Sequence, residues 1–76
     1  THAGAELDLF LLLNGKRIGI EIKYSDAPST TRSMRVAISD LSLDQLFVIY
    51  PGSDDYSLDD KIEVVSLSSM LSRLHA

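Results

Sequence analysis

The chain has 76 residues, enough for one small domain and too few for two, and a domain of this size buries only about 60% of the surface that its unfolded form exposes. Hydrophobic residues make up 45% of the sequence and charged residues 24%, which excludes intrinsic disorder, and the absence of cysteine excludes disulfides, thiolate metal sites and cysteine nucleophiles. The net charge of −4 argues against strong nonspecific DNA binding, because that affinity comes from Lys and Arg on phosphates.

The first third of the chain has the pattern of an antiparallel hairpin. Residues 5–13 carry apolar side chains at every odd position from 7 onwards and charges only at even positions, which is the period of a strand. Asn14 and Gly15 follow, and this pair is a strong hairpin signal because a type I′ turn needs positive φ at both central residues. Residues 16–24 alternate again. The sequence therefore predicts a hairpin over residues 6–24.

The middle of the chain predicts a helical crossover to a third strand. Ser29 or Thr30 can cap a helix over about residues 30–41, after a break in the second strand that contains Pro28. Residues 45–50 form a short apolar run that is typical of a buried strand. Because a strand, a helix and a second strand form a right-handed crossover, we expect the third strand to lie parallel to the second.

The last third completes a small α/β fold. Residues 52–60 predict an acidic loop, residues 61–65 a short fourth strand, and residues 67–74 a closing helix with one apolar side. The fold class that we predict is α/β, with a mixed four-stranded sheet and two helices. We expect a single domain over residues 1–76, and because the chain begins at Thr1 rather than Met, we expect it to be a fragment of a longer protein.

The turn also predicts which side chains of the hairpin face each other. With the turn at residues 14 and 15, the position numbers of every cross-strand pair sum to 29, so Asp8 faces Glu21. The same register places Glu6 opposite Lys23. Because side chains alternate between the faces of a strand, these four charges share one face, while the apolar side chains at 7, 9, 11, 18, 20 and 22 share the other. We expect the apolar face to be the core.

Asp8, Glu21 and Lys23 form a candidate catalytic site. Carboxylates directly opposite each other destabilise a sheet by roughly 0.2–1 kcal/mol, and a divalent cation turns this repulsion into ligation because Mg²⁺ takes oxygen ligands. Lys23 then lies where it can hold a phosphate oxygen or orient a water, as metal-assisted phosphodiester hydrolysis requires. Phe10 and Leu12 share the charged face, which predicts a cleft rim. The alternative is an ordinary solvent-exposed face of a hairpin.

The same residues carry a resemblance to a known family. Asp8, a strand, a turn and then Glu21-Ile22-Lys23 resemble the PD-(D/E)xK motif of the restriction-endonuclease-like nuclease superfamily. The wider segments 4–8, 20–28 and 46–52 look like the C-terminal domain of bacterial and archaeal AAA-type P-loop ATPases.

This resemblance implies a fold, a metal site and a catalytic lysine. The fold would be a trimmed restriction-endonuclease-like one, with Asp8 and Glu21 as ligands of Mg²⁺ or Mn²⁺ and Lys23 as the catalytic lysine. The sequence departs from the pattern at Leu7, which replaces the proline of the motif, and it lacks the helix that usually precedes the motif. A P-loop is also absent from the chain, so we expect no ATP binding by that mechanism.

The resemblance further implies partners and a cellular setting. We expect the chain to be a nuclease-like C-terminal domain that contacts the N-terminal ATPase region of its parent protein, binds DNA weakly and is cytoplasmic, while oligomerisation stays open. No apolar run approaches the roughly 18 residues of a membrane span, so we expect no membrane association. The alternative is a noncatalytic interaction or assembly module of the ATPase, which the net charge of −4 favours.

Two further basic residues lie near the candidate site in the predicted fold. Arg32 and Arg35 are three apart on the predicted helix and could contact phosphates near Lys23. A solvated helix face is the alternative interpretation.

Overall fold

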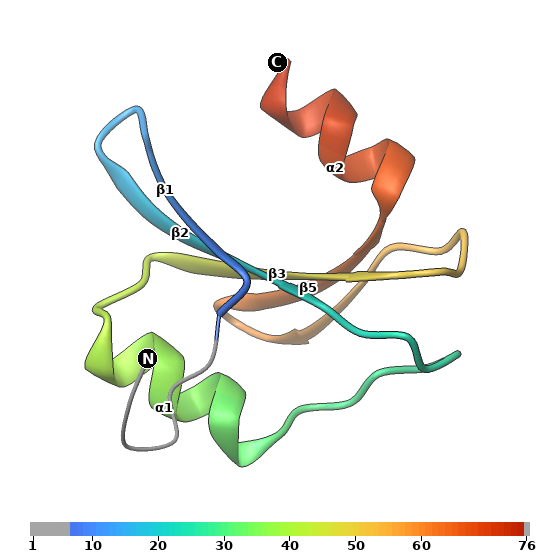
Figure 1. The fold of residues 1–76 in the computed structure, drawn as a ribbon, viewed down its shortest axis with the longest axis horizontal. Coiled ribbons are helices and arrows are strands. Elements are labelled where there is room, and N and C mark those ends of the chain that lie inside the picture. Colours follow the sequence, from blue (N-terminus) through green and yellow to red (C-terminus); the bar gives the residue numbers. More distant parts are fainter. Residues whose placement is uncertain (1–6, 76) are drawn as a thin grey trace.

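The computed structural model describes residues 7–75, which form five strands and two helices in a single layered unit (Figure 1). The elements in chain order are β1 (Leu9–Leu13), β2 (Lys16–Ile22), α1 (Arg32–Asp40), β3 (Gln45–Tyr50), β4 (Tyr56–Asp59), β5 (Ile62–Ser66) and α2 (Leu67–Leu74). The predicted class, a small mixed α/β domain with two helices, is confirmed. The predicted strand count of four is wrong, because β4 adds a fifth strand.

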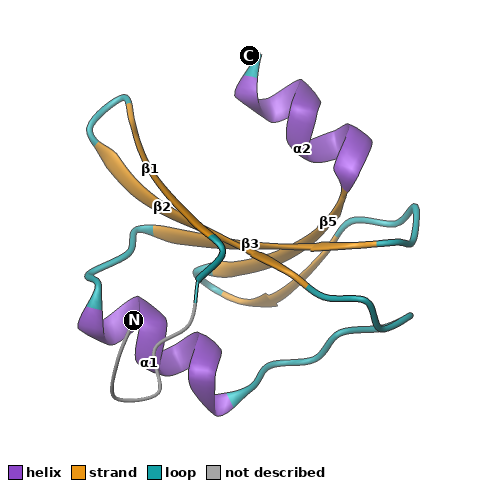
Figure 2. Cartoon of the chain, in the orientation of Figure 1, coloured by secondary structure: helices purple, strands orange, loops and turns teal. Residues whose placement is uncertain are grey.

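The sheet has the strand order β1-β2-β3-β5-β4. Its three central strands run parallel to one another, and each edge strand pairs antiparallel with its neighbour. The predicted hairpin and the predicted parallel pairing of the second and third strands are therefore both confirmed. The β2–α1–β3 crossover carries α1 over one face of the sheet, and α2 lies on the opposite face (Figure 2).

Each face of the sheet has its own apolar core, which follows from the alternation of side chains along β3. Leu46 and Val48 point into the cluster that contains Met34 of α1. Phe47 and Ile49 pack in the cluster that contains Met70 of α2. The expectation of one core face and one charged face is therefore wrong, because both helices cover the sheet and bury both sides of its central strands.

Helix α1 starts two residues later than predicted. The cap is Thr31, whose Oγ1 accepts a hydrogen bond of 3.2 Å from the N–H of Met34. Ser29 and Thr30, the predicted caps, precede it outside the helix. Any Ser or Thr in this run has the chemistry of a cap, so the sequence alone did not distinguish them.

Strand β4 lies within the segment predicted as an acidic loop. Tyr56 and Leu58 are half-buried while Ser57 and Asp59 are exposed, which is the period of an edge strand with one face on the core. The ring of Tyr56 meets the ring of Tyr50 edge to face at 5.9 Å, and its hydroxyl donates a 2.9 Å hydrogen bond to the carbonyl of Pro28. These contacts outweigh the weak β-propensity of the surrounding aspartates.

A charged network fixes the start of α2. Ser66 caps the helix by accepting from the N–H of Ser69 at 3.1 Å. The carboxylate of Asp55 accepts hydrogen bonds from the Ser66 N–H at 3.2 Å and from the Ser69 hydroxyl at 2.6 Å. Arg73 bridges Glu63 and Asp55. The Ser69 hydroxyl first, and then the Ser66 N–H, lower the pKa of Asp55 below its ordinary value of 3.8.

We predict that Asp55→Asn lowers the melting temperature at pH 7 and that the gap to the wild type closes in acid. A carboxyl whose pKa is lowered by folding contributes stability above its unfolded pKa, and that stability is lost as the pH falls below about 3.8. Thermal unfolding followed by circular dichroism between pH 2 and pH 7 measures the gap. Asp54→Asn is the control one residue away, and a gap that stays constant with pH would contradict this role of Asp55.

Candidate active site

The hairpin that carries the candidate residues has the predicted register up to Leu9. The paired positions run from Leu13–Lys16 to Leu9–Ile20. Asn14 and Gly15 have φ of 53° and 78°, as the predicted type I′ turn requires. At the other end of β1 the chain bends at Asp8, and the Asp8 N–H donates a 3.0 Å hydrogen bond to the carbonyl of Ile20. Two consecutive residues thus lie opposite Ile20, which is the arrangement of a β-bulge.

The bulge overturns the predicted faces at the base of the hairpin. An extra residue on one strand of a pair moves the side chains beyond it to the other face of the sheet. Leu7 packs against the α1-side core, and its Cδ2 lies 2.9 Å from the position that a Cβ at Gly19 would occupy. The predictions that Leu7 shares the face of the hairpin isoleucines and that Asp8 pairs directly with Glu21 are therefore wrong.

Asp8 uses part of its carboxylate to complete the ladder that the bulge interrupts. Its Oδ2 accepts a 2.7 Å hydrogen bond from the N–H of Ile22. On the other side of β2 the N–H of Lys23 bonds to the carbonyl of Ile49 at 2.9 Å. Asp8 is exposed, and its other carboxylate oxygen, Oδ1, takes no part in the hydrogen bond with Ile22.

Glu21 is buried on the α1 face of the sheet. Its register partner on β3 is the fully buried Val48, and Glu21 itself is only 5% exposed. The Nζ of Lys23 lies 2.9 Å from its Oε2 and compensates its charge. This contact lacks hydrogen-bond geometry, so neither Oε atom has a hydrogen-bond donor among residues 7–75. A buried carboxylate in this state is unusual, because buried polar groups nearly always find a donor.

The structure thus brings Asp8, Glu21 and Lys23 to one end of the hairpin, but in different environments. The side chain of Lys23 is 36% exposed and that of Glu21 only 7%. The described part of the chain holds no group of three or more His, Cys, Asp or Glu side chains that could bind a metal ion. Any ion here would have at most two carboxylates from these residues, and Mg²⁺ is commonly held by one or two carboxylates together with water and phosphate oxygens.

The other predicted candidates lie elsewhere. Glu6, predicted to pair with Lys23, lies outside the described residues. Arg32 and Arg35 are exposed on α1. Arg35 lines a pocket with Lys61 and Asp60, at the turn between β4 and β5, which accords with a solvated helix face.

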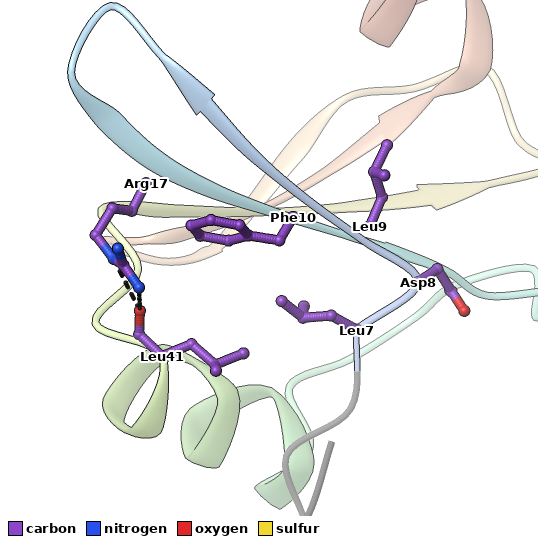
Figure 3. A pocket seen from close by; sticks show the side chains of 6 residues that line it. All are labelled: Leu7, Asp8, Leu9, Phe10, Arg17 and Leu41. Atoms are coloured by element: carbon purple, nitrogen blue, oxygen red, sulfur yellow. Dashed lines mark hydrogen bonds between the residues drawn. The ribbon is translucent and has the colours of Figure 1, made fainter.

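A pocket beside Asp8 lies between β1 and the end of α1 (Figure 3), where the sequence predicted a cleft rim from Phe10 and Leu12 but not the contribution of Arg17 and Leu41. Its volume is about 330 Å³, and its lining residues are Leu7, Asp8, Leu9, Phe10, Arg17 and Leu41. The guanidinium of Arg17 lies 4.9 Å from the centroid of the Phe10 ring. Alternation along β2 puts Arg17 on the face of Glu21, a signal that could have singled it out.

Comparison with known proteins assigns the chain to a family. The model of a domain of unknown function, DUF4143, matches residues 1–70. The chain belongs to the DUF4143 family. Two mycobacterial relatives, uncharacterized protein Rv2008c of Mycobacterium tuberculosis and uncharacterized protein Mb2031c of Mycobacterium bovis, are each 42% identical to it over 71 residues. The aligned segment covers 93% of this chain and 16% of each relative, so this DUF4143 chain spans about a sixth of their length.

No solved structure matches this DUF4143 chain. Within residues 7–75, neither helix has the length and apolar character needed to cross a bilayer.

We predict that Asp8→Ala lowers the free energy of unfolding by about 1 kcal/mol, because the Ile22 N–H loses its charged acceptor but can still reach water. Asp8→Asn keeps an acceptor and should cost clearly less. Urea unfolding of the three proteins measures both values. Equal stability of Asp8→Ala and the wild type would show that the bond contributes nothing to folding.

We also predict strong coupling between Glu21 and Lys23. Lys23→Met should cost about 2 kcal/mol, because it leaves the Glu21 carboxylate buried without its cation. The double variant Glu21→Met with Lys23→Met should recover most of that loss, because it removes the buried charge as well. A double-mutant cycle in urea measures the coupling, and additive losses would contradict it.

Proposed function

We propose that this domain is a nuclease-like C-terminal domain of a P-loop ATPase and hydrolyses phosphodiester bonds of DNA with Mg²⁺ or Mn²⁺. The observation that carries the proposal is the Glu21 carboxylate, which is 5% exposed, has the Lys23 ammonium 2.9 Å from Oε2 and leaves Oε1 without a hydrogen-bond donor among the described residues. A divalent cation would ligate the Glu21 oxygen that Lys23 leaves without a partner. The donor set, two carboxylates, suits a hard oxygen-binding ion.

The topology around Glu21 supports the same proposal. The residues that resemble the PD-(D/E)xK motif lie on the antiparallel hairpin predicted from the residue pattern, and the sheet contains this hairpin followed by a helical crossover to a parallel strand. The first acidic residue precedes β1, and the Glu21-Ile22-Lys23 segment spans the end of β2. A β-bulge beside the site is also common in active sites, where it re-aims a side chain.

Each residue would have a distinct role. Asp8 and Glu21 would hold the ion from two positions at the base of the hairpin, Asp8 through the oxygen that Ile22 does not use. When bound, the ion supplies a water of lowered pKa and polarises the phosphate. Lys23, which is partly exposed, would hold a phosphate oxygen and stabilise its developing charge.

The first test is a Mn²⁺ titration of the chain followed by backbone amide NMR. We expect saturable changes centred on Asp8, Glu21 and Lys23, and a melting temperature that rises with Mg²⁺ because the ion binds the folded state. The double variant Asp8→Ala with Glu21→Ala is the control, and its spectra should show no such changes. Amides of these residues that stay silent up to millimolar Mn²⁺ would refute the metal site.

The second test is cleavage of DNA oligonucleotides. We expect Asp8→Ala, Glu21→Ala and Lys23→Ala each to reduce metal-dependent cleavage by at least about 100-fold, as expected when transition-state stabilisation is lost. Asp40→Ala, an exposed acid at the end of α1, is the matched control and should retain activity. Thermal unfolding of each variant confirms that the domain is folded. Wild-type activity in Lys23→Ala would exclude the proposed role of that residue.

A noncatalytic docking module of the ATPase is the second candidate, and exposed apolar side chains favour it. Leu9 and Ile22 are 49% and 45% exposed at the base of the hairpin, and Leu67 and Leu71 are 57% and 49% exposed on α2. Such residues can bind another part of a longer polypeptide. The same Mn²⁺ titration separates the candidates, because a docking module needs no metal.

A further inference from the structure

We propose that the pocket between β1 and the end of α1 binds an unpaired nucleobase of a DNA strand. The inference rests on the proposed function, since it names single-stranded DNA as the substrate of that site. The pocket borders the site through Asp8, which is both one of its lining residues and a proposed metal ligand.

The size and lining of the pocket suit one small planar group. Its volume of about 330 Å³ is at the lower end of the range of ligand pockets, which are mostly apolar with a few polar groups. The side chains of Leu7, Phe10 and Leu41 point into one common space (Figure 3). Arg17 closes the end that is remote from Asp8.

Phe10 lies where its ring can stack on a base. Phe10 is 40% exposed, although the Arg17 guanidinium lies 4.9 Å from the centroid of its ring. Arg17 is itself held in place, since its Nε and Nη2 donate hydrogen bonds of 3.0 and 2.8 Å to the carbonyl of Leu41. The ring therefore lies beside a cation that is held in place, and aromatic rings stack on any base because every base has a π face.

The position of Asp8 connects the pocket to the reaction site. Asp8 lines the pocket, but its carboxylate points away from the pocket and accepts the hydrogen bond from the Ile22 N–H (Figure 3). Pocket and metal ligand thus lie on two sides of one residue. Phe10 pairs with Gly19, four residues before Lys23, so a phosphate at Lys23 and a base at Phe10 would lie about 13 Å apart along β2.

Charge favours a single strand over a duplex. A duplex is bound through many Lys and Arg contacts to phosphates, and this chain has a net charge of −4. A base can enter the pocket only after it leaves its stack, which costs least in a strand that is already unpaired. Stacking on Phe10 then supplies affinity that the charge of the domain cannot.

The test is fluorescence anisotropy with a labelled oligothymidylate and with the same strand in duplex form, in EDTA so that no cleavage occurs. We expect tighter binding of the single strand, and a loss of about 5- to 150-fold in Phe10→Leu, which keeps an apolar side chain and removes the ring. Phe10→Tyr should retain affinity. Leu12→Ala is the matched control, because Leu12 lies on the same strand and face and is 68% exposed.

The outcomes separate this proposal from the proposed function. Unchanged affinity in Phe10→Leu, or tighter binding of the duplex, overturns the base pocket even where cleavage depends on Asp8 and Lys23. Binding that requires Phe10 without metal-dependent cleavage supports the pocket and refutes the nuclease. Upfield shifts of the Phe10 ring protons in the wild type on adding the oligonucleotide give the same answer if Phe10→Leu does not fold.

Discussion

The hydrogen bond between the Ile22 N–H and the Asp8 carboxylate organises the base of the hairpin. The carboxylate takes the place of a backbone carbonyl as the acceptor for the Ile22 N–H, at the point where the Asp8–Leu9 bulge interrupts the ladder. The bulge turns Leu7 onto the α1 face, where it covers Gly19 together with Leu43. A Cβ at Gly19 would lie 2.7 Å from Leu43 Cδ1 and 2.9 Å from Leu7 Cδ2, so a larger residue at this position would displace the ends of both leucine side chains.

The crossover helix then determines the environment of Glu21. Because α1 packs on the face of the sheet that Glu21 shares with Val48, a residue that would be solvated on an isolated hairpin becomes 5% exposed. Burial makes the charge costly unless it is paired, and Lys23 supplies one cation at the rim. The candidate site is thus a product of the βαβ unit as a whole and not of the hairpin that carries its residues.

The sequence was sufficient to predict those features of the fold that depend on a local residue pattern. The Asn14-Gly15 turn specified the register of β1 and β2, and the apolar run at 45–50 specified a buried parallel strand. The sequence was insufficient where tertiary contacts determine the local structure. The bulge at Asp8 depends on a side chain bonding to the backbone of another strand, and β4 depends on Tyr56 packing against Tyr50. The pocket at Phe10 required knowledge of where α1 ends, and only the fold supplies that.

Two charged clusters of the domain differ in how many hydrogen-bond donors their carboxylates have. At the start of α2, Asp55 receives hydrogen bonds from Ser66, Ser69 and Arg73, and Arg73 also binds Glu63, so the charges are satisfied by one another. At the base of the hairpin, Glu21 is more deeply buried and has an ion pair but no hydrogen-bond donor among the described residues. A cluster that only stabilises the fold would be expected to resemble the first. The Oε1 of Glu21 has no donor among the described residues and stays available to a ligand, and this is the physical reason for proposing the site at Glu21 and not at Asp55.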